Sequence, residues 1–195
     1  MSVPLDTPRA GIPTDAFLGL RALNVQTYTE SNIKNGVEFE FSNYNASLAA
    51  GVTQYLRFVT AAKPVIIKAR NISFTDVGIT ARVYKAPTIS GVWTERTDVF
   101  NLRTDGLAVA KTARLYVGGV VDNVGTEIAA PTYGIGSTGV GQTVFSTFSV
   151  QGQERILAAN TDHLLAITNS STNPIRVATY LTWYEGATDL PRSAD

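Results

Sequence analysis

IRVATYLTWYE, residues 175–185, decides the fold class because apolar and polar side chains alternate along it with a period of two. Successive side chains of a β-strand point to opposite faces, so one face of this segment is predicted to lie in a core. That face carries Ile175, Val177, Thr179, Leu181 and Trp183, and the opposite face carries Arg176, Ala178, Tyr180, Thr182 and Tyr184.

Similar strand patterns recur from Leu20 onward, in short runs rich in Val, Ile, Thr, Tyr and Phe that are separated by Gly, Asn, Asp and Pro. In VEFEFS, residues 37–42, Phe39 and Phe41 share a face with Val37 that is predicted to be buried, whereas Glu38 and Glu40 share a solvated face. The other predicted strands are LRALNVQTYTE (20–30), TQYLRFVT (53–60), PVIIKARNISF (64–74), GITARVYKA (78–86), ARLYVGGVV (113–121), TVFSTFSV (143–150) and DHLLAITNS (162–170).

No segment between these runs is long enough for the helical crossover that joins parallel strands. The stretch from Ser47 to Gly51 is predicted to form at most one helical turn, and residues 103–113 are the other ambiguous segment. We therefore predict an all-β fold, an antiparallel β-sandwich of jelly-roll-like type. Its single domain covers residues 20–186, between an extended proline-rich N-terminal arm, residues 1–19, and a C-terminal tail, residues 187–195.

Composition narrows the partners. The 195 residues include 16 basic and 16 acidic ones, so no overall charge favours nucleic acid. The charged fraction of 16% is low, and such a neutral surface suits packing against other proteins.

With no cysteine, disulfides and thiolate chemistry are excluded. Because neither a signal-peptide pattern nor a membrane-length apolar run occurs, we expect a soluble chain made in a cytoplasm, with no membrane partner.

YGIGSTGVG, residues 133–141, contains the pattern G-x-G-x-x-G, with Glu154 at the distance of about 20 residues that a dinucleotide-binding fingerprint shows. That fingerprint needs a buried strand before it and a helix after it. Here a proline-containing segment precedes it and a strand-like segment follows, so nucleotide binding is not expected. We predict instead an exposed connection with φ > 0 freedom, a second candidate protein contact beside the arm. Its glycines are Gly134, Gly136, Gly139 and Gly141.

Catalytic residue types are scarce. His163 is the single histidine and no G-x-S-x-G elbow occurs, so we predict a structural or surface histidine at a strand start. Glu38 and Glu40 are the closest acidic pair, and we favour a solvated sheet surface over a proton-transfer site. Histidine-based metal sites and calcium loops are absent from the sequence, although scattered carboxylates leave metal binding open. We predict no enzyme activity and no cofactor.

Aromatic and arginine side chains allow two interpretations. Trp93, Tyr116, Trp183 and Tyr184 could form a sugar-stacking platform. We favour the alternative in which Trp183 belongs to the core of the last strand and Trp93 covers a sheet edge. The three arginines inside predicted strands are expected to be solvated or to face an interface, and they are Arg82, Arg114 and Arg176.

ILAANTDHLLAITNSS, residues 156–171, and PIRVATYLTWYEG, residues 174–186, resemble parts of small β-sandwich virion proteins of tailed bacteriophages, either head-decoration (cement) or head-fibre and tail-associated proteins. The resemblance extends more weakly to LRFVTAAKPVIIKARNISF, residues 56–74. It implies a structural protein present in many copies, located in the virion, and bound to the major capsid protein or another virion protein.

Such a protein gains affinity from contacts repeated by symmetry, and we expect it to be a homo-oligomer. The arm is the first candidate contact segment, because an extended segment can order on a neighbouring subunit. A carbohydrate- or receptor-binding module is the second hypothesis, with a glycan as the possible partner. The candidate arm contacts are Pro4, Pro8, Arg9, Pro13 and Phe17.

Overall fold

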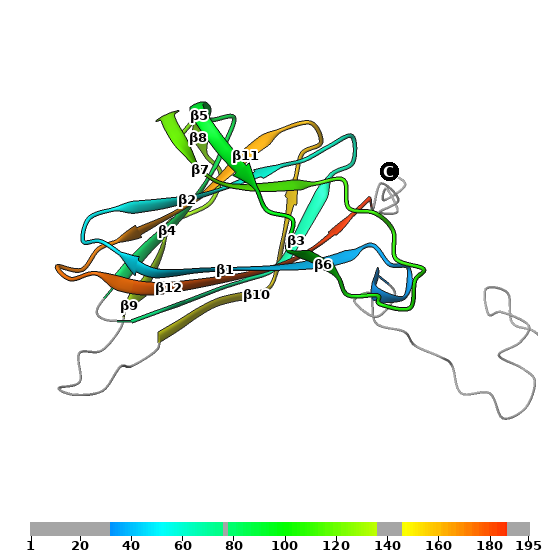
Figure 1. Cartoon of the computed structure of the whole chain (residues 1–195), viewed down its shortest axis with the longest axis horizontal. Coiled ribbons are helices and arrows are strands. Elements are labelled where there is room, and N and C mark those ends of the chain that lie inside the picture. Colours follow the sequence, from blue (N-terminus) through cyan, green and yellow to red (C-terminus); the bar gives the residue numbers. More distant parts are fainter. Residues whose placement is uncertain (1–31, 76–77, 136–145, 187–195) are drawn as a thin grey trace, which may run out of the picture. The chain divides into compact units, whose positions relative to one another are not determined.

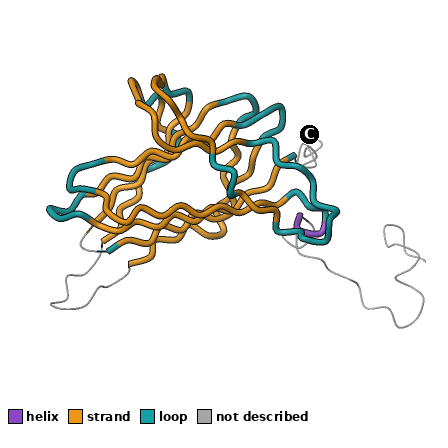
Figure 2. Tube along the Cα trace, in the orientation of Figure 1, coloured by secondary structure: helices purple, strands orange, loops and turns teal. Residues whose placement is uncertain are grey.

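The computed structural model describes residues 32–75, 78–135 and 146–186, without the side chains of residues 146–153. Within these ranges the regular structure is β-strand, apart from a helical turn at residues 32–34 (Figure 2). No helix in the described part of the chain is long and apolar enough to cross a membrane. The strands are β1 (Glu38–Leu48), β2 (Thr53–Val59), β3 (Val65–Phe74), β4 (Gly78–Lys85), β5 (Thr88–Glu95), β6 (Val99–Asn101), β7 (Arg114–Asn123), β8 (Thr126–Glu127), β9 (Thr132–Ile135), β10 (Ser146–Leu157), β11 (Asp162–Asn169) and β12 (Ile175–Glu185).

Two antiparallel sheets pack face to face (Figure 1). Sheet A has the strand order β10-β3-β12-β1-β6 and forms the lower layer in Figure 1. Sheet B has the order β5-β7-β2-β11-β4-β8, and β9 also pairs with β4. The two-layer arrangement buries the inner face of each sheet against the other.

The pairing is nested along the chain. β1 pairs with β12, β2 with β11, β3 with β10, and β4 with β9. These pairs lie alternately in sheet A and sheet B, so the chain is one long antiparallel hairpin rolled into a sandwich. That is the jelly-roll arrangement. The predicted all-β, jelly-roll-like sandwich is confirmed, with β5, β6 and β7 inserted between β4 and β8.

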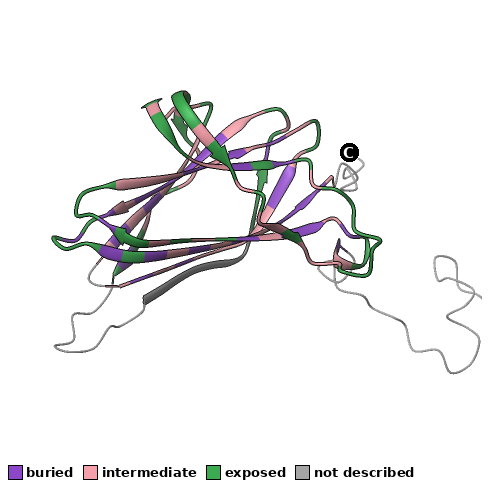
Figure 3. Cartoon of the chain, in the orientation of Figure 1, coloured by how far each residue is buried: buried purple, intermediate pink, exposed green. Residues whose placement is uncertain are grey.

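The core lies between the sheets, as the period-two pattern predicts (Figure 3). Trp183 of β12 is fully buried, and its ring centroid lies 5.9 Å from that of Phe39 in sheet A and 5.3 Å from that of Phe58 in sheet B. The edge-on contact with Phe58 joins the two layers. The predicted core position of Trp183 is confirmed, as is the buried face of its strand.

Two irregularities bend sheet A near its β10 edge. In the pairing of β3 with β12, Thr182 faces Ala69 and Trp183 faces Ile67, so Lys68 is an extra residue. In the pairing of β10 with β3, the register shifts between Gln151 and Arg155. Bulges of this kind bend the strands that contain them, and Figure 1 shows β10 turning upward toward sheet B.

The structure differs from the sequence-based prediction at Ser47 and at Glu38. Ser47 belongs to β1, which continues to Leu48 before a turn at Gly51, where φ is +70°. The stretch that could have formed one helical turn therefore begins as strand, because pairing with β12 extends β1 to Leu48. Glu38 is only 3% exposed and not solvated, since β1 is covered on both sides by neighbouring strands and Tyr184 lies directly opposite.

Gly134 lies in strand β9 and not in a connection between strands. It pairs with Ile79 and is buried, and a Cβ atom added to it would lie 2.5 Å from Cε1 of Phe74. The absence of a side chain therefore permits close packing by an aromatic ring, and the predicted need for positive φ does not apply at this position.

Candidate functional site: a cationic cavity between the sheets

A cavity of about 500 Å³ lies inside the sandwich, and residues from both sheets line it. Residues 129–131, between β8 and β9, and Thr132 at the start of β9 form one side together with Glu154 and Arg155 of β10. Arg155 is exposed there, so this part of the lining is the mouth. A volume of this size falls within the range of roughly 300–1,000 Å³ that is usual for small-molecule sites.

The inner wall of the cavity is apolar. Sheet A contributes side chains from β3, β10 and β12, and sheet B contributes side chains from β2 and β4. The positions follow from the period-two pattern, which points these side chains inward. The apolar wall includes Leu56, Phe58, Ile67, Val83, Leu157 and Leu181.

Arg70 is the polar group that the core pattern does not explain. It stands on β3 two residues before Ile72, which is fully buried, and it lines the cavity. Among the described residues, its buried Nε–H has no hydrogen-bond partner, and Nη2 makes one long contact of 3.4 Å to the Thr132 hydroxyl. Burial, followed by repulsion from Arg155, lowers the pKa of the Arg70 guanidinium. Arg70 is therefore a half-buried, partly desolvated cation next to a second cation.

Arg155 lies at the mouth and donates a hydrogen bond to the backbone carbonyl of Ile128. Neither Arg155 nor Arg70 forms an ion pair with any described residue. Four other arginines in the described ranges each have a carboxylate partner: Arg57 with Asp162, Arg82 with Glu127, Arg96 with Asp98 and Arg103 with Asp105.

His163, the second residue of β11, also lines the cavity. It is 3% exposed, and no described residue forms a hydrogen bond with its Nδ1. Burial lowers the pKa of its imidazole. Its place at a strand start agrees with the sequence-based prediction, and burial identifies it as the structural and not the surface kind of histidine.

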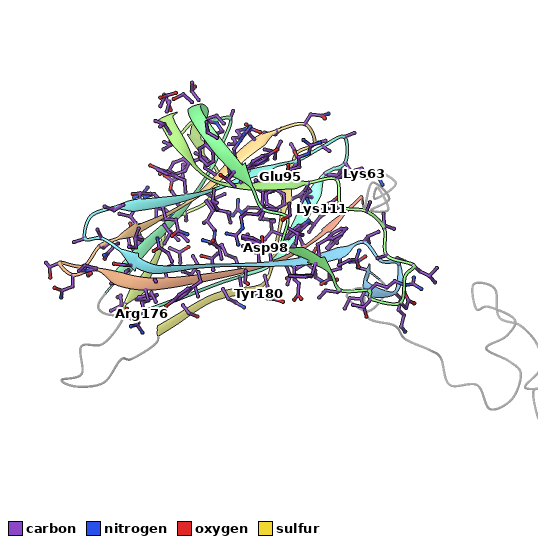
Figure 4. All side chains as sticks on the ribbon, viewed as in Figure 1. Lys63, Glu95, Asp98, Lys111, Arg176 and Tyr180 are labelled. Atoms are coloured by element: carbon purple, nitrogen blue, oxygen red, sulfur yellow. The ribbon has the colours of Figure 1, made fainter. Side chains whose placement is uncertain are left out.

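The nearby carboxylates are engaged elsewhere. Glu154 accepts a 3.1 Å hydrogen bond from the Tyr184 hydroxyl. Glu40 accepts a 2.7 Å bond from Tyr180, which Figure 4 shows on the outer side of sheet A. Burial and the Glu40 carboxylate raise the pKa of Tyr180 to about 12. Among the described residues, no group of three or more His, Cys, Asp or Glu side chains could hold a metal ion.

Glu38 is the other acidic residue of this region. Its Oε2 lies 4.0 Å from Nζ of Lys68. Burial raises the pKa of the Glu38 carboxyl, and Lys68 opposes that effect. The predicted solvated pair is therefore wrong for Glu38, while Glu40 is half-buried and bonded to a tyrosine.

The four predicted platform aromatics do not share one surface, because Trp183 and Tyr184 are buried in sheet A whereas Trp93 and Tyr116 lie on sheet B. Trp93 is on edge strand β5, and the Arg57 guanidinium contacts both its ring and the Tyr116 ring. The guanidinium lies 5.9 Å from the centroid of the Trp93 ring and 5.0 Å from that of the Tyr116 ring. Trp183 is sealed in the core and Tyr184 lies on sheet A. The predicted edge position of Trp93 is confirmed.

The remaining predicted residues divide by location. Arg82 is half-buried in β4, and Arg114 and Arg176 are exposed on β7 and β12, as predicted for solvated positions. The arm residues Pro4, Pro8, Arg9, Pro13 and Phe17 lie outside the described residues, as do residues 20–31, Gly136, Gly139, Gly141 and the tail 187–195.

Sequence reasoning missed Arg70 and Arg155. The sequence PVIIKARNISF contained a signal for Arg70, because this charged residue falls on the same strand face as Ile72 and Phe74. The bulge at Lys68 obscures that pattern, and nothing local marks Arg155.

Comparison with known proteins identifies no relative: no protein-family model matches the chain, and searches of curated proteins and solved structures give no match. The site is therefore interpreted from its own chemistry.

Proposed function

We propose that this protein is a non-enzymatic structural protein of a bacteriophage virion, of the head-decoration or cement type. In this proposal it binds the major capsid protein or another virion protein through contacts that the symmetry of the particle repeats. The resemblance of residues 156–171 and 174–186 to small virion proteins suggests this role. The surface of the jelly roll supports it.

One group of exposed apolar side chains carries the proposal. Phe100, Leu107 and Val109 expose 63%, 66% and 45% of their surface, and we call these three residues the β6 surface. Asn101 ties them together, since its amide donates hydrogen bonds to the carbonyls of Gly36 and Val109. Exposed apolar side chains on a segment that hydrogen bonds fix in place are typical of protein contact sites.

A second apolar pair lies on the insertion. Val92 in β5 and Val120 in β7 are 87% and 53% exposed, at the outer edge of sheet B. Each of the two surfaces offers only a small contact. Many weak contacts become tight binding when a particle presents them in fixed geometry.

The test mixes the purified full-length protein with undecorated phage heads and images the particles by electron cryomicroscopy. Phe100→Asp is expected to weaken the apparent affinity for heads at least about tenfold, because a charge would be buried in the contact. The occupancy seen on the particles should fall accordingly. Val52→Asp is the matched control, since Val52 is 46% exposed in the turn between β1 and β2. Absence of the wild-type protein from heads, or equal loss in both variants, would contradict the proposal.

Deleting residues 2–19 tests the arm, which includes Pro4, Pro8, Arg9, Pro13 and Phe17. We expect weaker binding to heads with an unchanged thermal unfolding midpoint, because the arm supplies contact area and no core. Unchanged occupancy would remove the arm from the proposal.

A glycan- or receptor-binding module is the alternative, and Trp93 is its best residue because it is half-buried at a sheet edge beside Arg57. Loss of glycan-array signal in a folded Trp93→Ala variant would favour it. Trp183 cannot serve in this test because it is fully buried.

A further inference from the structure

We propose that the cavity between the sheets binds a small amphipathic acid, a molecule with one carboxylate on an apolar body, and that Arg70 and Arg155 hold the carboxylate. This site is independent of the proposed role in the virion. Its evidence is the charge, the apolar wall and the size of the cavity.

The positive charge of Arg70 and Arg155 favours an anionic ligand. A desolvated cation is costly unless an opposite charge or a full set of hydrogen bonds compensates it. In the described part of the chain Arg70 has one long contact and an Nε–H without a partner, and Arg155 adds a second positive charge. A carboxylate between them would accept the Nε–H and Nη–H groups of a guanidinium as a pair of parallel hydrogen bonds.

The protein itself supplies no such carboxylate among its described residues. Glu154, the acidic residue in the cavity lining, is bonded to the Tyr184 hydroxyl. Asp162, next to His163, pairs with Arg57 at 2.7 Å, and Glu127, in β8 before the mouth segment, pairs with Arg82 at 3.0 Å. No described carboxylate therefore forms an ion pair with Arg70 or Arg155, and the carboxylate of a ligand would supply that partner.

The position of the two arginines orients the ligand. Arg70 reaches Thr132 and Arg155 reaches Ile128, so both guanidinium groups lie toward the segment that forms the mouth. Behind them the wall is apolar and includes Phe58 and Leu181. The acid group would lie at the mouth and the apolar body would extend inward between the sheets.

The cationic mouth and the apolar wall together argue against two simpler classes of ligand, inorganic anions and uncharged apolar molecules. An inorganic anion would leave the apolar wall without a partner, and an uncharged apolar molecule would leave Arg70 uncompensated. One carboxylate is enough because Arg155 is exposed to solvent while Arg70 is half-buried, and Lys68, the third cation of the lining, already lies 4.0 Å from the Glu38 carboxylate.

Calorimetric titration of the full-length protein with decanoate, below its micelle concentration, tests the site. We expect decanoate to bind at least about tenfold more tightly than decanol, which lacks the charge, or acetate, which lacks the apolar body. Arg70→Met should weaken decanoate binding at least about tenfold, since a charge-assisted pair of hydrogen bonds is lost.

Arg176→Met is the matched control, because Arg176 is an exposed strand arginine that Figure 4 shows away from the interior. It should leave decanoate binding unchanged. If Arg70→Met does not fold, Arg155→Met at the exposed mouth takes its place and should weaken binding severalfold. No decanoate binding up to about 1 mM, equal binding of decanol, or equal binding by the Arg70 or Arg155 variant would overturn the proposal.

Discussion

Glu185 and Arg70 both bring a charge into the sandwich, but their surroundings differ. The Glu185 carboxylate is 6% exposed and accepts hydrogen bonds from the backbone N–H groups of Thr112 and Ala113, from the Thr112 hydroxyl and from Trp183 Nε1. Within the described ranges, Arg70 has a single long contact, to a threonine hydroxyl. A buried charge whose hydrogen bonds are complete belongs to the fold, and one whose hydrogen bonds are incomplete is open to a ligand.

The largest effect is expected at Glu185. Replacing it with alanine should lower the free energy of unfolding by about 3–5 kcal/mol, because several buried donors lose their acceptor at once. Chemical denaturation measures the change. Glu95→Ala is the control, since Glu95 is exposed and lies 3.7 Å from Lys111, and it should cost less than about 1 kcal/mol. Equal losses in both variants would show that Glu185 is not part of the fold.

Arg70 should respond in the opposite direction. Without ligand, Arg70→Met is expected to raise the free energy of unfolding by about 1–3 kcal/mol, since an apolar side chain replaces a half-buried cation that has no described ion-pair partner. The same denaturation measurement checks it. A loss of stability comparable to that of the Glu185 variant would mean that Arg70 already has the partners it needs.

Arg57 provides the intermediate case. It lies in β2, pairs with Asp162 at 2.7 Å and contacts the Trp93 and Tyr116 rings. Arg57→Met should destabilise the protein by about 1 kcal/mol, because the ion pair is partly solvated and the ring contacts are modest. Arg176→Met should change stability by less than about 0.5 kcal/mol. A gain of stability in Arg57→Met would remove the distinction between the paired and the unpaired arginines.

Replacing Glu38 should change the free energy of unfolding least, and the change should depend on pH. Burial raises the pKa of this carboxyl above 4.5 in the folded state, so the folded state binds the proton more tightly than the unfolded state. The resulting stabilisation is fully present below about pH 4.5 and is lost as the pH rises through the folded-state pKa.

Glu38→Gln should therefore gain stability relative to wild type as the pH rises above 4.5 and then reach a plateau. Denaturation curves at several pH values measure the difference. A difference that shrinks with rising pH would indicate that the Lys68 attraction outweighs burial.

Much of the fold could be predicted because its determinants are local. The alternation in residues 175–185 identified the buried face that holds Trp183, and the lack of helical segments excluded a parallel sheet. The strand order, the nested pairing and the bulge at Lys68 could not be predicted, since they depend on contacts between distant segments. Gly134 illustrates the same limit, because its neighbour is the ring of Phe74.

The candidate site was less predictable than the fold. His163 was noticed for its rarity, but its burial beside a cavity depends on how the two sheets pack. Arg70 broke the apolar alternation of its strand, which is a local signal, whereas its lack of a carboxylate partner is a property of the whole sandwich. Pairing of charges is spatial, and sequence spacing does not reveal it.

The resonance of the Arg70 Nε–H group tests the central claim most directly. We predict that titrating the full-length protein with decanoate shifts this ¹H–¹⁵N signal to saturation, because the unpartnered N–H gains a carboxylate acceptor. Decanol should leave it in place. A signal that does not move with decanoate, or that moves equally with decanol, would contradict the assignment of Arg70 as the open charge of the sandwich.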